Sequence, residues 1–171
     1  MDRINNAIKN FYNGYNCCQS LVLAYCDMFN LDSEKAAYIA SGFGAGMGGL
    51  REKCGAVTAM FMLAGLAKRG YDRNCIESKK DLYSLIKLLN GKFEERFKTT
   101  NCKELLKKAN VFASSTPSAR TKEYYNIRPC ACFVEYAGEL VEKYILSDVL
   151  TENSGKIKNV ILKNKVKDKQ K

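Results

Sequence analysis

Apolar residues recur every three or four positions along most of the chain, which is the spacing of one face of an α-helix. The clearest stripe lies in residues 78–98 and consists of Leu82, Leu85, Ile86, Leu89 and Phe93. No segment alternates apolar and polar residues in the way that a half-buried strand does. The pattern therefore predicts an all-α fold.

Residues that favour helix starts sharpen this prediction. Asn16 and Asn101 are good N-caps, Asp32 or Ser33 caps a third helix, and Pro129 suits a first helical position. We expect helices over residues 3–12, 17–29, 35–41, 54–67, 78–98, 102–108 and 129–148, and a loop over residues 113–121. The sequence therefore predicts one compact bundle of about six or seven helices.

A glycine-rich segment, residues 42–49, interrupts the helical pattern. Gly44, Gly46 and Gly49 match G-x-G-x-x-G, but the dinucleotide fingerprint needs a preceding strand, and a helical pattern precedes this one. No Lys-Ser or Lys-Thr pair follows, so the segment is not a P-loop. We expect no bound nucleotide, and interpret the segment as an interhelical loop that delivers Cys54 to the next helix.

Length and charge suggest one domain and a polar tail. The 171 residues suit a single helical domain, which we place at residues 1–148. Residues 149–171 form a Lys-rich tail, and the net charge of the chain is +10. No zinc-finger spacing or aromatic-interleaved basic motif accompanies this charge, so we expect a solvated tail and no nucleic-acid binding.

The apolar segments predict neither a secretion signal nor a membrane span. The N-terminus has no apolar core of a signal peptide, and the longest apolar stretch, Cys54 to Ala67, is shorter than the roughly 20 residues that cross a bilayer. We therefore expect a cytoplasmic protein. In a reducing compartment, its eight cysteines would be thiols, metal ligands or redox pairs.

Histidine is absent, which narrows the chemistry. Without an imidazole, a Ser–His–Asp triad, a Cys–His pair and a histidine-ligated metal are all excluded. No C-x-x-C occurs either, which argues against a thioredoxin-type pair and a zinc ribbon. If cysteines act together, the fold must bring them from distant helices.

Four cysteines share one local setting at the start of a predicted helix. They are Cys17, Cys54, Cys102 and Cys130. Free N–H groups and the helix dipole favour a thiolate at such a position. Cations lie next to these cysteines in sequence, namely Arg51, Lys53, Lys103 and Arg128. Cys130 and Cys132 could both face a common site and bind a cofactor there, or only one of them could.

This combination of motifs resembles the C_GCAxxG_C_C family, a four-cysteine family whose members are inferred to be redox-active. The motifs that carry the resemblance are G-Y-N-C at 14–17, G-F-G-A-G at 42–46, C-G-A-V-T-A at 54–59, Asn101-Cys102, and Cys130 ahead of Val134 and Ala137. Together they cover roughly residues 5–146. Ala59 stands where the family motif has its final glycine.

The resemblance implies an all-helical domain with Cys17, Cys54, Cys102 and Cys130 as its key cysteines. These would bind an iron–sulfur cluster, our first expectation, or carry out thiol–disulfide exchange, as an oxidoreductase or an electron carrier. A redox protein or a small thiol would be the partner, and a homodimer is left open. The alternatives are a structural four-cysteine zinc site and a helical interaction module without redox activity.

Overall fold

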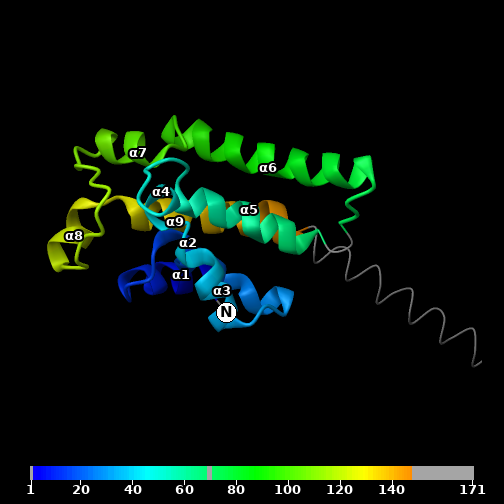
Figure 1. Cartoon of the computed structure of the whole chain (residues 1–171), viewed down its shortest axis with the longest axis horizontal. Coiled ribbons are helices and arrows are strands. Elements are labelled where there is room, and N and C mark those ends of the chain that lie inside the picture. The colour runs from blue at the N-terminus through cyan, green and yellow to red at the C-terminus, as the bar shows by residue number, and fades with distance from the viewer. Residues whose placement is uncertain (1, 69–70, 148–171) are drawn as a thin grey trace, which may run out of the picture.

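The computed structural model describes residues 2–68 and 71–147, and every regular element among them is a helix (Figure 1). In chain order these are α1 (Arg3–Tyr12), α2 (Cys17–Tyr25), η1 (Cys26–Phe29), α3 (Ser33–Ser41), α4 (Gly44–Met47), α5 (Gly55–Ala67), α6 (Ile76–Phe97), α7 (Cys102–Lys108), α8 (Lys122–Ile127), α9 (Cys130–Val141) and η2 (Glu142–Leu146). The expected all-α fold is confirmed. The tail expected at 149–171 lies outside the described residues.

The helices number slightly more than the six or seven expected. The sequence pattern did not indicate α8, which is only six residues long and buries none of them. It also excluded a regular helix in the glycine-rich segment, where the structure has the single turn α4. Ala45 and Gly46 have φ values of 53° and 67° inside that turn, so it is not a regular helix.

Helix α5 occupies the centre of the bundle. It packs against α2, α6 and α9, while α1 packs against α2 and α9. Val57, Met60 and Leu63 are fully buried, and apolar residues cover most of the helix, as expected of a helix with neighbours on several sides. Among the described residues, no helix combines the length and the apolarity needed to cross a bilayer.

Helix α6 buries its predicted stripe only in part. Leu89 and Phe93 are fully buried, whereas the three earlier positions of the stripe are partly buried at the margin of the core. The ring of Phe93 lies 4.8 Å from that of Phe97 and 6.0 Å from that of Phe133. The C-terminal half of α6 therefore anchors this helix to the bundle.

The helix starts follow the predicted caps. The Asn16 side chain accepts hydrogen bonds from the backbone N–H groups of Cys18 and Gln19, and the Gln19 side chain accepts one from the Asn16 N–H, which forms a capping box. Asn101 caps α7 by accepting from the Glu104 N–H at 3.1 Å. Pro129, expected as the first residue of its helix, is instead the N-cap of α9, so that helix begins at Cys130. Figure 1 shows α4, α7, α8 and the start of α9 at one end of the molecule.

Candidate redox site

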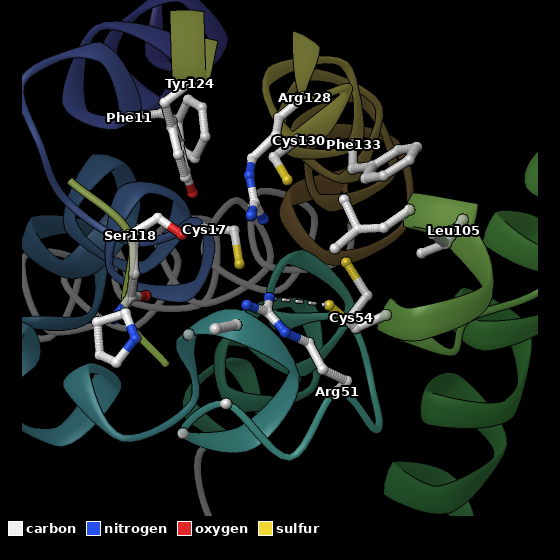
Figure 2. Close-up of a pocket in the computed structure, with 18 of the residues that line it drawn as sticks. Phe11, Cys17, Arg51, Cys54, Leu105, Ser118, Tyr124, Arg128, Cys130 and Phe133 are labelled. Atoms are coloured by element: carbon white, nitrogen blue, oxygen red, sulfur yellow. Dashed lines mark hydrogen bonds between the residues drawn. The ribbon is translucent and has the colours of Figure 1, made fainter. Parts of the chain in front are cut away.

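One cavity of about 270 Å³ collects the four cysteines that share a helix-start position. Cys17, Cys102 and Cys130 are the first residues of α2, α7 and α9, and Cys54 is the N-cap of α5. The sulfur atoms of Cys17, Cys54 and Cys130 point into the same space (Figure 2). The fold therefore brings together side chains that lie far apart in sequence.

Backbone pairing fixes two of the four helix starts to each other. Lys53 and Asn101 form an isolated antiparallel bridge. The Cys54 N–H donates to the Thr100 carbonyl at 2.8 Å, and the Cys102 N–H donates to the Glu52 carbonyl at 2.6 Å. These bonds hold the backbone of Cys54 and Cys102 in register, although almost fifty positions separate them in sequence.

The glycines serve close approach to the cysteines. A Cβ on Gly46 would lie 2.6 Å from Cys102 Cβ, and one on Gly55 would lie 2.5 Å from Cys17 Sγ. A Cβ on Gly44 would overlap the side chain of Asn16, the cap of α2. The glycine-rich loop is thus packed between the starts of helices that carry cysteines. The interpretation that it places thiols agrees with this packing.

The other cysteines do not line the cavity. Cys132 is exposed, so Cys130 and not Cys132 is the cysteine of α9 that faces the site. Cys18 and Cys26 are buried in the core, and Cys75 is the N-cap of α6. The single-residue spacing between Cys130 and Cys132 gave no way to decide between them from sequence, because the rotation of α9 depends on its packing.

Arg51 is a buried cation at the cavity. Its side chain is only 8% exposed, and its Nε donates to the Ser114 carbonyl at 2.8 Å, with Nη2 donating to the same oxygen. Its Nη1 lies 3.9 Å from Cys102 Sγ (Figure 2). Arg51 itself has a φ of 62°, which is rare for a residue with a side chain. The loop geometry therefore turns a guanidinium towards a thiol.

Two further arginines line the cavity. Arg128 and Arg120 lie over the ring of Tyr124, at 4.5 Å and 4.6 Å from its centroid. Arg120 lies in the segment expected to be a loop, where no local pattern marks it as a site residue. Two other cations near cysteines in sequence do not line the cavity. Lys53 instead donates to Asn90 and Thr100, and Lys103 is exposed.

Burial raises the pKa of three of the cavity thiols, Cys54, Cys102 and Cys130, and so favours the thiol over the thiolate expected from their helix-start positions. Burial raises the pKa of Cys54 well above its usual value and that of Cys130 to about 12. It also raises the pKa of Cys102, and the hydrogen bond from Arg51 lowers it by less. The backbone N–H of Ala56 lowers the pKa of Cys54, but desolvation outweighs it.

Cys17 has a particular place among the four. A negative charge on Cys17 raises the pKa of Cys54, Cys102 and Cys130. In each case its effect is larger than the effect of a charge on any other cysteine. Its Sγ packs where Gly55 lacks a side chain, next to Cys54 in sequence. A thiolate at Cys17 would therefore disfavour ionisation of the other three thiols.

The donor set suits a cluster in kind, but the present spacing does not match a bound metal ion. Four cysteines are the ligands that iron–sulfur clusters and tetrahedral zinc take. Among the described residues, however, no group of three or more cysteine, aspartate or glutamate side chains is gathered closely enough to hold a metal ion. Ligation would require the sulfur atoms to draw together.

Comparison with known proteins identifies the family of the chain. Residues 15–144 match the family described as "Putative redox-active protein (C_GCAxxG_C_C)", a range that covers more than half of the chain and all four cavity cysteines. No curated protein and no solved structure gave a significant match. The chain therefore belongs to the C_GCAxxG_C_C family.

Proposed function

We propose that this protein is a thiol–disulfide redox protein whose cavity cysteines, Cys17, Cys54, Cys102 and Cys130, form one redox centre. The observation that carries the proposal is that thiols from four separate helix starts line one cavity. Thiols that pack only as small apolar residues have no reason to share a cavity and a helix position. The oxidised partner would be a small disulfide or the disulfide of another protein.

The proposed reaction exchanges two electrons. A cavity thiol, losing its proton, attacks one sulfur of the partner disulfide; that S–S bond breaks, and the departing thiolate takes a proton. A second cavity thiol then attacks the protein sulfur of the mixed disulfide, forms a protein disulfide and releases the other half as a thiol. Two protein thiols are oxidised and one disulfide becomes two thiols. A dithiol reductant reverses the sequence.

Cys17 is the proposed common partner in this exchange. A negative charge on Cys17 would raise the pKa of each of the other three thiols more than a charge on any other cysteine would. Arg51 would assist at Cys102, because its guanidinium favours the thiolate there. Since burial raises the pKa of Cys54, Cys102 and Cys130, these three would react when a disulfide enters the cavity and not with solvent oxidants in general.

An iron–sulfur cluster is a second candidate. An all-cysteine donor set around one cavity, with arginines nearby to neutralise negative charge, favours it. The same four cysteines would hold the cluster, which would supply one-electron transfer when bound. In this second candidate, Arg51 would stay hydrogen-bonded to the Ser114 carbonyl and compensate part of the charge beside Cys102.

Purification without oxygen separates these candidates. Iron, zinc, acid-labile sulfide and free thiols are counted on one sample, and the thiols are counted again after a small disulfide is added. The proposal predicts a protein without metal that loses two thiols, which reductant restores. Iron together with sulfide would show that the cysteines bind a cluster, and zinc would show a structural metal site. Eight thiols that do not react with the disulfide would show that the cysteines only pack in the core. Each count is repeated with Cys17→Ser, and with Cys132→Ser as the control outside the cavity.

A further inference from the structure

Among the described residues, the charged side chains that line the cavity are all positive. Three arginines line it, and its described lining includes no aspartate or glutamate. The ion pairs that the described residues form are Arg3–Asp27, Lys80–Glu77 and Lys92–Glu95, and none involves a cavity arginine. Arg51 is buried, and Arg120 and Arg128 are half-buried. Guanidinium groups withdrawn from water are usually paired with an anion, so three without a carboxylate partner leave a place for one.

The arginines also have unused hydrogen-bonding capacity. Arg120 Nη1 is buried and has no hydrogen-bond partner among the described residues. Arg128 contacts the face of Tyr124, and its guanidinium reaches into the cavity beside the sulfur of Cys130 (Figure 2). Guanidinium groups bind carboxylates through paired, charge-assisted hydrogen bonds.

These charges lie close to the redox thiols. The positive charges of Arg128 and Arg120 both lower the pKa of Cys130, against the larger effect of burial, and that of Arg128 also lowers the pKa of Cys102. An anion bound by these arginines would therefore lie within electrostatic reach of the cysteines.

The remaining lining limits the size and nature of the ligand. Phe11, Leu105, Leu106 and Phe133 give the cavity apolar walls. Its volume of about 270 Å³ is near the lower end for small-molecule sites, which begin at roughly 300 Å³. A folded protein segment would not fit inside, whereas a short aliphatic molecule with charged ends would.

We propose that the natural substrate is a small organic disulfide bearing carboxylate groups, held by Arg120 and Arg128 with its S–S bond facing the cavity cysteines. This inference rests on the proposed thiol–disulfide function and adds the substrate class. The electron balance is that given above, with the carboxylate disulfide as oxidant and two carboxylate thiols as products.

Three disulfides of similar length test the inference. Reduced, metal-free protein is mixed with dithiodipropionate, which is anionic, with hydroxyethyl disulfide, which is neutral, and with cystamine, which is cationic. Each rate of protein-thiol loss is divided by the rate of the same disulfide with mercaptoethanol, which corrects for intrinsic reactivity. We expect the anionic disulfide to react roughly tenfold or more faster than the neutral one, and the cationic one to be slowest. Equal corrected rates would overturn the inference.

Matched arginine variants locate the preference. Arg128→Gln should remove most of the preference for dithiodipropionate, and Arg128→Lys, which keeps the charge, should retain part of it. Arg96→Gln is the control, because Arg96 also packs on an aromatic ring, 4.7 Å from the Tyr136 centroid, but does not line the cavity. A loss of preference in Arg96→Gln equal to that in Arg128→Gln would contradict a cavity site and point to the net charge alone.

A ligand that cannot react separates this inference from the proposed function. Suberate has the length and both carboxylates of dithiodipropionate but no S–S bond, and its binding is measured by calorimetry, with octanediamine as the cationic control. Suberate binding without any disulfide reaction would support the anion site but overturn both the redox function and the disulfide substrate. If disulfides react without any charge preference and suberate does not bind, the redox function stands and the anion site is overturned.

Discussion

The packed core and the cysteine cavity are built by different physical rules. In the core, α5 buries Val57, Met60 and Leu63 against neighbouring helices, and any apolar residues of suitable volume would serve. At the cavity, individual side chains have individual partners, such as Arg51 with the Ser114 carbonyl and with Cys102. A substitution in the core should therefore change the stability of the fold, whereas a substitution at the cavity should change the thiol chemistry.

The largest expected effect is the loss of thiol–disulfide activity in Cys17→Ser. Cys17 is the proposed common partner of the other three thiols, so without it the mixed disulfide is resolved slowly and reversible two-thiol oxidation should fall strongly. Serine is of similar size but more polar, and Cys17 is buried, so the unfolding free energy should fall by roughly 1–3 kcal/mol with the fold retained. Thiol loss with a small disulfide is measured by mass spectrometry. The exposed Cys132→Ser should behave like the unchanged protein, and equal effects of the two would contradict the assignment.

A substitution in the core is expected to lower stability without changing the redox activity. Leu63 is fully buried, so Leu63→Ala should lower the unfolding free energy by about 2–5 kcal/mol through the cavity it leaves. The number of thiols that a small disulfide oxidises should stay the same. Urea unfolding and thiol counts on one preparation check both. A stable Leu63→Ala variant that had lost redox activity would show that the two regions are not separable.

A smaller, mixed effect is expected at the glycine-rich loop. Gly46 has a φ of +67°, and a Cβ there would lie 2.6 Å from Cys102 Cβ. Gly46→Ala should therefore cost about 1–3 kcal/mol of stability and slow the oxidation of Cys102. Gly65, an exposed helical glycine with open space around it, is the control, and Gly65→Ala should gain about 0.5–1 kcal/mol. Equal behaviour of the two variants would argue against close packing at the loop.

The smallest predicted effect is a loss of stability at alkaline pH. Burial raises the pKa of Cys130 from 9.0 to about 12, so the folded state keeps a proton that the unfolded chain releases above its own pKa. The stabilisation is complete below pH 9.0 and declines as the pH rises towards 12. Unfolding free energies in reductant, measured at about pH 7 and about pH 10, should show the decline. Cys130→Ala should reduce it only in part, because burial also raises the pKa of Cys54 and Cys102. An unchanged decline would assign it wholly to those thiols or to Tyr25, whose pKa burial also raises.

Much of the fold could be predicted because its signals are local. Asn16, Asp32 and Asn101 cap helices as the sequence indicated, and the range predicted for the first helix agrees with α1. The apolar run at 54–67 became the central helix α5. Helix α8 could not be predicted, since six residues without a buried position carry no periodic signal.

The site was predictable only in part. Position at a helix start singled out the four cavity cysteines, because capping residues precede three of them and the glycine-rich loop precedes Cys54. Arg120 and the bridge between Lys53 and Asn101 depend on tertiary contacts that leave no mark in the sequence. The protonation of the thiols was expected the wrong way round, because a helix start is visible in sequence while the desolvation of a side chain is not.

The central claim is that the four cavity cysteines form one redox centre, and differential alkylation tests it most directly. Reduced protein is treated with one equivalent of a small disulfide, free thiols are alkylated with one reagent, and oxidised ones with another after reduction. Mass spectrometry then assigns the state of each cysteine. The account predicts that oxidation is confined to Cys17, Cys54, Cys102 and Cys130, with Cys18, Cys26, Cys75 and Cys132 remaining thiols. Oxidation at Cys75 or Cys132 with the cavity cysteines unchanged would contradict it.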